Sequence, residues 1–152
     1  MLNTLRKTIA ASFLIFCLTA AAQEMGYWRA ASNTARAITG DITLSEEKLG
    51  INFLTFPIVR VRALTDSELS AAFDSDNSLA HSGSLYKVDI SGSKKFLHKN
   101  TLCSNEDAEW IATYVSGRTL QMAFFSSQTP PLLTMEGRAN ASDLCGTYSY
   151  VK

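Results

Sequence analysis

The chain contains little of what most catalytic or metal sites require. Among its 152 residues there are only two histidines, His81 and His98, and three cysteines, Cys17, Cys103 and Cys145. No H-x-x-x-H or C-x-x-C spacing frames these residues, which argues against a metal site. Nucleophile elbows, phosphate-binding glycine loops, zinc-binding helices and kinase signatures are also absent from the sequence. We therefore expect no enzymatic activity, no catalytic residue, no metal and no cofactor.

An excess of charge of one sign is lacking as well. The 14 basic side chains equal the 14 acidic ones, so the formal net charge is zero. Binding to nucleic acid needs clustered lysines and arginines that replace the counterions of the phosphates. Binding to an anionic membrane surface likewise needs a polybasic segment. We expect neither nucleic acid nor a membrane surface as a partner.

The apolar run over residues 9–18 is too short for a transmembrane helix, which needs about 20 apolar residues. Two basic residues, Arg6 and Lys7, precede this run, and three alanines at 20–22 follow it. This order is typical of a secretory signal peptide that is cleaved after Ala22. We therefore predict a periplasmic or secreted protein without a stable membrane anchor.

Cleavage after Ala22 would leave residues 23–152, the size of one ordinary domain. It would remove two of the 14 basic side chains and none of the 14 acidic ones, which leaves a net charge of −2. Cys17 would be removed too, and the bulky Phe16 before it is unsuited to a lipid-attachment site. The two remaining cysteines, Cys103 and Cys145, are separated by 42 positions. An even pair in an oxidising compartment predicts a disulfide, worth about 4 kcal/mol for a loop of this length.

Alternation of apolar and polar residues, the period of a β-strand, dominates the remaining chain. A polar turn at 45–48 joins two such runs as a hairpin, and in the second run Leu49, Ile51 and Phe53 alternate with polar residues or glycine. Pro57 cannot donate to a ladder, so it should lie at a strand start, an edge or a bulge. The predicted strands cover residues 27–29, 38–44, 49–53, 54–64, 85–90, 95–98, 110–115, 119–125 and 144–151.

Only one helix is predicted, over residues 66–73. Thr65 and Glu68 have the spacing of a capping box, in which each side chain bonds the backbone N–H of the other residue. An apolar pattern at i, i+3 and i+4 follows. Residues 74–84 and 134–143 are polar and are expected to form loops.

Eight or nine short strands, paired mostly as sequence neighbours, predict a mainly β domain. We expect a small antiparallel β-barrel or curved meander of about eight strands with one short helix, because closure removes exposed sheet edges. A β-sandwich is the alternative. The clearest candidates for an interface are aromatic residues with polar atoms, which also commonly pack in cores. They are Tyr27, Trp28, Trp110, Tyr114, Tyr148 and Tyr150.

Three segments carry a resemblance. Residues 28–44 followed by Thr101-Leu102-Cys103, together with the closing Cys145-Gly146-Thr147-Tyr148, resemble an uncharacterised group of small exported alphaproteobacterial proteins. The architecture alone is similar to periplasmic lysozyme-inhibitor and lipocalin-like protease-inhibitor barrels. The resemblance carries no known activity and transfers no functional residue.

Two functional hypotheses follow from the sequence. The first is an exported, non-catalytic binding or inhibitor module, acting in the periplasm or outside the cell on a protein or a small apolar ligand. The alternative is a secreted factor that is delivered to a host cell, where it would serve virulence.

Overall fold

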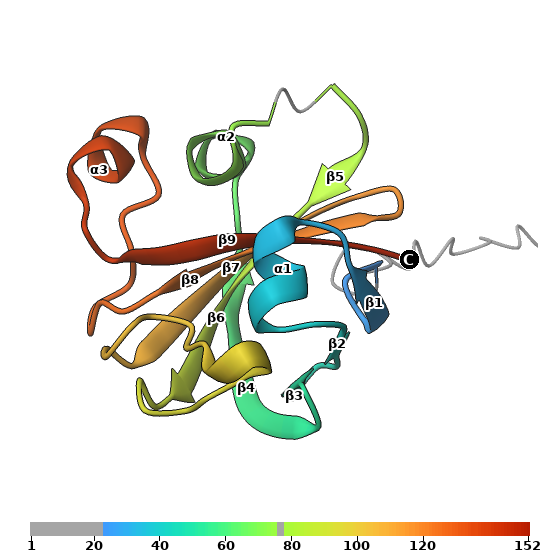
Figure 1. Cartoon of the computed structure of the whole chain (residues 1–152). Helices are drawn as coiled ribbons and strands as arrows, with labels where there is room; N and C mark the ends of the chain where they lie inside the picture. Colours follow the sequence, from blue (N-terminus) through green and yellow to red (C-terminus); the bar gives the residue numbers. More distant parts are fainter. Residues whose placement is uncertain (1–22, 76–77) are drawn as a thin grey trace, which may run out of the picture.

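The computed structural model describes residues 23–75 and 78–152 (Figure 1). The predicted signal peptide and Cys17 lie outside these residues. The elements in chain order are β1 (Gly26–Ala30), α1 (Asn33–Ile38), β2 (Ile42–Leu44), β3 (Lys48–Ile51), β4 (Leu54–Ala63), α2 (Asp66–Phe73), β5 (His81–Ser82), β6 (Ser84–Ile90), the 3-10 turn η2 (Leu97–Lys99), β7 (Ala108–Ser116), β8 (Thr119–Phe125), α3 (Met135–Asn140) and β9 (Leu144–Val151).

The fold is a closed antiparallel β-barrel of eight strands, which confirms the predicted fold class. Around the barrel the strands follow the order β4, β3, β2, β1, β9, β8, β7, β6 and back to β4. The first and last strands meet through Arg29 with Val151 and Ala30 with Tyr150. One further strand, β5, lies outside this ring. It pairs with the end of β7, beyond the residues of β7 that pair with β6. Because the ring is closed, few backbone N–H and C=O groups are left unpaired at sheet edges, which is the reason a barrel was predicted.

Strand β4 changes partners in its middle. Its first half pairs with β3 as far as Pro57, which lies opposite Lys48, and its second half pairs with β6 from Ile58 onward. Pro57 therefore lies at the changeover between two ladders, where the N–H that proline lacks is not needed to continue either one. The register shift in β4 falls later, between Arg60 and Arg62.

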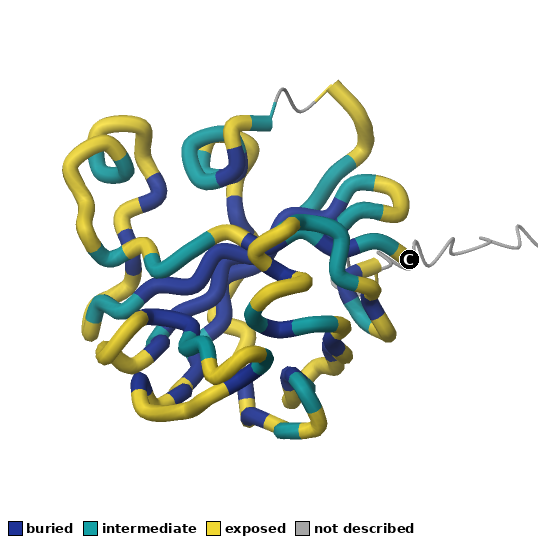
Figure 2. Tube along the Cα trace, in the orientation of Figure 1, coloured by how far each residue is buried: buried dark blue, intermediate teal, exposed yellow. Residues whose placement is uncertain are grey.

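Two hydrophobic cores lie on opposite faces of the barrel wall. In Figure 2 the trace of β7 and β8 is mostly in the colour of buried residues. The inner core receives side chains from all eight barrel strands, among them Trp28 of β1, Phe124 of β8 and Tyr150 of β9. The outer core lies between the outer face of β6, β7 and β8 and the segments that cover it. Leu69 and Phe73 of α2 belong to this outer core. Both faces of β7 and β8 are consequently buried.

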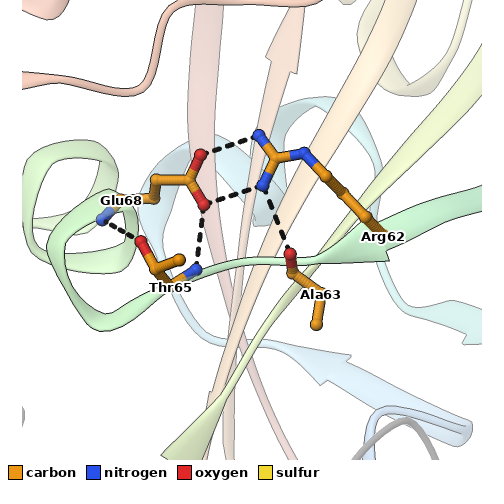
Figure 3. Close-up of polar contacts among 4 residues, drawn as sticks. All are labelled: Arg62, Ala63, Thr65 and Glu68. Carbon is orange, nitrogen blue, oxygen red and sulfur yellow. Dashed lines mark hydrogen bonds and ion pairs between the residues drawn. The ribbon is translucent and has the colours of Figure 1, made fainter.

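Helix α2 has the predicted bounds and the predicted cap (Figure 3). Thr65 Oγ1 accepts from the Glu68 N–H at 3.3 Å, and Glu68 Oε2 accepts from the Thr65 N–H at 2.9 Å. Arg62 at the end of β4 donates to both carboxylate oxygens of Glu68, at 2.8 and 2.7 Å. These hydrogen bonds from Arg62 hold the pKa of Glu68 below its usual range. The cap therefore fixes α2 against the strand that precedes it.

The prediction of a single helix was wrong, because α1 and α3 are helical as well. Ser32 caps α1 by accepting from the Ala35 N–H at 3.1 Å, so Ile38 ends a helix rather than beginning a strand. Thr134 caps α3 in the same way, accepting from Gly137 at 2.9 Å. Helix α3 buries none of its residues, and it therefore has no amphipathic pattern that the sequence could reveal. Figure 1 shows α2 and α3 on the same side of the barrel.

Two local predictions also differ from the structure. Residues 95–98 form no strand, because the chain turns at η2, where His98 and Lys99 both have left-handed backbone angles. Within the predicted loop 74–84, His81–Ser82 form the short strand β5. Two paired residues are too few to show a period of two, so β5 could not be recognised in the sequence.

Cys103 and Cys145 form the predicted disulfide, with their Cα atoms 4.7 Å apart. The bridge joins the loop after η2 to the beginning of β9. Among residues 23–75 and 78–152, no helix is long and apolar enough to cross a membrane.

Candidate functional site

The barrel interior is a packed core. Side chains from neighbouring strands pack against each other there, for example Phe124 of β8 and Tyr148 of β9, whose ring centroids are 5.3 Å apart in an edge-to-face arrangement. Polar groups inside the barrel pair with one another, as Thr39 Oγ1 and Tyr150 Oη do at 2.8 Å. This interior differs from barrels that enclose a ligand, whose walls surround a cavity. The candidate site therefore lies on the outside of the barrel.

Five of the predicted interface aromatics are buried in these cores. Trp28, Tyr148 and Tyr150 belong to the inner core, and Trp110 and Tyr114 belong to the outer core. Burial raises the pKa of Tyr148 to about 12 and also raises that of Tyr150, so both hydroxyls stay neutral at physiological pH. Their rings serve packing, which is the other role that such residues commonly have. Of the six aromatics, Tyr27 alone is exposed.

A hollow of about 480 Å³ lies on the outer face of β1, β2, β3 and β4. Four of its lining residues form a row across the strands, in which Tyr27 lies opposite Thr43, Thr43 opposite Gly50, and Gly50 opposite Thr55. Gly50, in the middle of this row, has no side chain to fill the hollow, and a Cβ there would lie only 2.3 Å from Thr43 Oγ1. The backbone of Gly50 thus forms the floor of the hollow, because this residue has no side chain.

Phe53 projects from the rim of this hollow. It was predicted to continue the alternation of Leu49 and Ile51 in a strand, but β3 ends at Ile51 and Phe53 lies in the two-residue turn before β4. Leu49 and Ile51 are buried as the pattern requires, whereas the Phe53 side chain is fully exposed. The spacing of two continues across the turn, and this coincidence hid the turn in the sequence.

The backbone at this turn is left-handed at both positions, with φ of 47° at Asn52 and 66° at Phe53. Two-residue hairpin turns of this kind favour Asn-Gly, because both central residues have positive φ. Asn52 fits the first position, but a phenylalanine at the second costs about 1–3 kcal/mol of backbone strain. The fold is therefore not what favours an aromatic residue at this tip.

Tyr27 is held in place at the opposite side of the hollow. Its hydroxyl donates a short hydrogen bond to Asp41 Oδ2, and Asp41 Oδ1 accepts from the Ala30 N–H at 2.9 Å. The hydrogen bond from Tyr27 lowers the pKa of Asp41, and the same bond raises the pKa of Tyr27. Asp41 is the one charged residue among those that line the hollow. The remaining lining is aromatic, aliphatic, amide or hydroxyl in character.

The histidine with the most polar surroundings is His81. Its Nδ1 lies 2.6 Å from the carbonyl oxygen of Leu79, and its Nε2 lies 3.0 Å from Asp66 Oδ1. The Tyr114 ring stacks on the imidazole at 5.8 Å between centroids. The two acceptors raise the pKa of His81, the Leu79 carbonyl contributing most. This contact joins α2 to β5, and in it both imidazole nitrogens are occupied by structural partners.

A second hollow, of about 440 Å³, lies beside the disulfide and is lined mainly by polar loop residues and by both cysteines. Over the described parts of the chain, no group of three or more His, Cys, Asp or Glu side chains is placed to hold a metal ion.

Glu24 was missed by the sequence analysis, and it is fully buried. Its carboxylate accepts hydrogen bonds from Tyr86 Oη at 2.7 Å, Ser84 Oγ at 3.0 Å and Thr113 Oγ1 at 3.0 Å. Nothing in the local sequence distinguishes this glutamate from an exposed one, because all three partners lie at least 60 positions away.

Comparison of the chain with protein-family models, with curated proteins and with solved structures gives no match.

Proposed function

We propose that this protein is an exported, non-catalytic binding module that recognises a protein partner through the face around Phe53. One observation carries the proposal: a fully exposed phenylalanine occupies a turn position with φ of 66°. Residues held in unfavourable backbone conformations cluster at binding and switch sites, where function maintains them against their cost in stability. An aromatic side chain beside an open hollow is also typical of the anchors that dominate protein interfaces.

The neighbouring hollow suits this role. A partner that accepts the Phe53 ring in a pocket of its own would bring other side chains against Tyr27 and the floor at Gly50. Asp41 already has two hydrogen-bond donors. The partner therefore need not supply a positive charge to satisfy it. We infer an uncharged, mainly apolar contact with a rim of hydroxyl and amide groups, a composition common in interface centres.

Export is the other half of the proposal. A disulfide is rare in reducing compartments and common in secreted proteins, and the Cys103–Cys145 bridge therefore supports export. Residues 1–22 support the same conclusion, because their two basic residues, apolar run and closing alanines have the order of a secretory signal peptide.

A photo-crosslinking side chain at position 53 tests the binding role in living cells. The matched control carries the crosslinker at Leu132, which is also an exposed apolar residue but lies after β8. A protein that crosslinks at position 53 and not at 132 should then bind purified wild-type chain. We expect Phe53→Gly to weaken that binding about tenfold or more, and Leu132→Ala to leave it unchanged.

Two results would contradict this function. One is equal binding of the partner by the wild type and by Phe53→Gly. The other is a small apolar molecule that is found in the hollow by native mass spectrometry and is retained when every protein partner is absent. That second result would replace the protein partner with a small ligand.

A further inference from the structure

The chain is fixed in the barrel wall from Glu24 onward. The buried carboxylate of Glu24 accepts three hydrogen bonds from hydroxyl groups of β6 and β7. Its carbonyl oxygen accepts from Trp28 Nε1 at 2.7 Å. Gln23, immediately before it, is exposed. Cleavage after Ala22 would therefore leave a terminus in which a single exposed residue precedes an anchored one.

A positively charged side chain is already bound to backbone carbonyl groups next to this terminus. The Lys152 ammonium donates to the carbonyl oxygen of Gln23 at 3.1 Å and to that of Met25 at 2.9 Å. It also lies 4.4 Å from the centroid of the Trp28 ring. The carbonyl oxygens and the aromatic face together form a site for one positive charge.

A free α-amino group on Gln23 would place a second positive charge beside this site. The amino nitrogen and the carbonyl oxygen of one residue are about 3 Å apart. The two ammonium groups would therefore lie within about 6 Å of each other, where like charges repel even near a protein surface. A glutamine can remove that charge by a reaction within its own side chain.

We propose that Gln23 becomes pyroglutamate after the signal peptide is removed, an inference that depends on the export half of the proposed function and not on the binding half. The α-amino nitrogen attacks Cδ of the side-chain amide and forms a new C–N bond. The bond from Cδ to the amide nitrogen breaks, and this nitrogen leaves as ammonia with the proton that the α-amine loses. The product is a five-membered lactam without charge, and the reaction needs no oxidant or reductant.

The exposure of Gln23 permits this cyclisation, because no packing holds its side chain away from its own amine. Glu24 behind it stays in place throughout, since its hydrogen bonds do not involve Gln23. Lys152 then faces a neutral lactam and keeps both of its carbonyl contacts. The mature terminus would also resist aminopeptidases that require a free α-amine.

Mass spectrometry of protein recovered directly from its cellular compartment tests the proposal. The full chain, expressed with its own residues 1–22, is digested with trypsin, which releases residues 23–29 as the N-terminal peptide because Arg29 is the first basic residue after position 22. We expect this peptide to be lighter than its sequence mass by one ammonia, about 17 Da, and to resist amine labelling at its terminus.

Gln23→Asn is the matched control, since its shorter side chain would require a strained four-membered ring. We expect this variant to retain the full mass and a terminus that accepts an amine label. A wild-type peptide that begins at Gln23 with full mass and a free amine would overturn cyclisation and leave export intact. A terminus at any other residue would overturn both the cleavage position and the proposal. Binding to the partner of Phe53 is measured separately, so its failure is distinguishable from either result.

Discussion

The two halves of the barrel wall use their outer faces differently. Outside β6, β7 and β8, helix α2 and the segment that contains Leu133 cover the sheet and form a second core. Outside β1, β2, β3 and β4, the wall is bare and carries the hollow, the exposed Tyr27 and the strained turn at Phe53. One half thus adds stability through a second buried layer, whereas the other half retains an unfavourable residue at its surface. The difference is the one that the proposed binding role requires: the covered half stabilises the fold, and the bare half keeps a surface open to a partner.

Two strands join these halves. Strand β9 pairs with β1 on one edge and β8 on the other, and β4 pairs with β3 and then β6. The disulfide fixes the beginning of β9. Substitutions at these junctions should therefore change the stability of both halves together. Substitutions within one half should show how the two halves differ.

The largest effect should come from removing the disulfide. Replacing both Cys103 and Cys145 by serine should lower the free energy of unfolding by about 4 kcal/mol, because the unfolded chain regains the freedom of the closed loop. Urea unfolding of the oxidised wild type and the double variant measures the difference. Equal midpoints would show that the bridge does not stabilise this junction.

Removing a side chain from the outer core comes next. Leu69→Ala in α2 should cost about 3 kcal/mol, since Leu69 is almost fully buried between the helix and the barrel. Leu132→Ala, an exposed control on the same half, should change stability by less than about 0.5 kcal/mol. A small effect of Leu69→Ala would mean that the outer layer is not a second core, and the contrast between the halves would fail.

Glu24 connects the start of the bare half to β6 and β7 of the covered half. Glu24→Gln should cost about 2 kcal/mol, because the amide NH₂ would face a hydroxyl donor in place of an acceptor. Glu46→Gln, at an exposed position of the turn before β3, is the control and should be neutral. Chemical denaturation of both variants checks the prediction, and equal stabilities would contradict it.

Phe53→Gly should change stability in the opposite direction. Glycine accepts positive φ without a Cβ clash, so the variant should gain about 1 kcal/mol while it loses binding. Phe53→Ala removes the same ring and keeps the clash, so it should lose binding without that gain. Thermal unfolding of the two variants separates strain from the loss of the aromatic ring. A destabilised Phe53→Gly protein would show that the ring serves the fold.

The smallest effect concerns His81 on the covered half. Because its pKa is raised in the folded chain, the charged form stabilises the contact with Asp66. That contribution is complete below the unfolded pKa of about 6.5 and is lost as the pH rises through the folded pKa. Hydrogen exchange of β5 and α2 should therefore accelerate over this range in the wild type. His81→Gln should show no such pH dependence beyond the intrinsic exchange rate, and identical profiles would remove His81 from the explanation.

The sequence could predict the strands of the bare half because only one face of each points toward a core, which imposes the period of two. Strands β7 and β8 are buried on both faces and are recognisable instead as short runs rich in aromatic and β-branched or other apolar residues. It could predict α2 because the capping box and the apolar pattern are both local. Helix α1 was hidden since it has only six residues and its last residue, Ile38, continues the alternation of apolar and polar residues that leads into β2. The disulfide was predictable from the even pair of cysteines that remains after the predicted cleavage, together with the oxidising compartment that the signal pattern indicates.

The candidate site could not be predicted from the sequence, and the reason differs from that for helix α1. Phe53 maintains the alternation of Leu49 and Ile51, so the pattern gave no sign that the strand had ended. Gly50 resembles any other glycine in a strand until Thr43 and Thr55 lie on either side of it. A site formed by one missing side chain and one strained turn depends on register between strands, which composition does not encode.

The pairing of β1 with β9 also has a consequence for the time course of folding. Arg29 and Val151, which lie opposite each other, belong to the first and last strands of the domain. During synthesis the chain emerges from its N-terminus, so β1 must wait without this partner until the final strand has left the ribosome. Contacts over such long sequence separations make folding slow, and unpaired strands are prone to aggregation meanwhile. A ribosome-stalled chain that ends before Leu144 should therefore remain protease-sensitive throughout, and the closed barrel should form only after residue 151 is released.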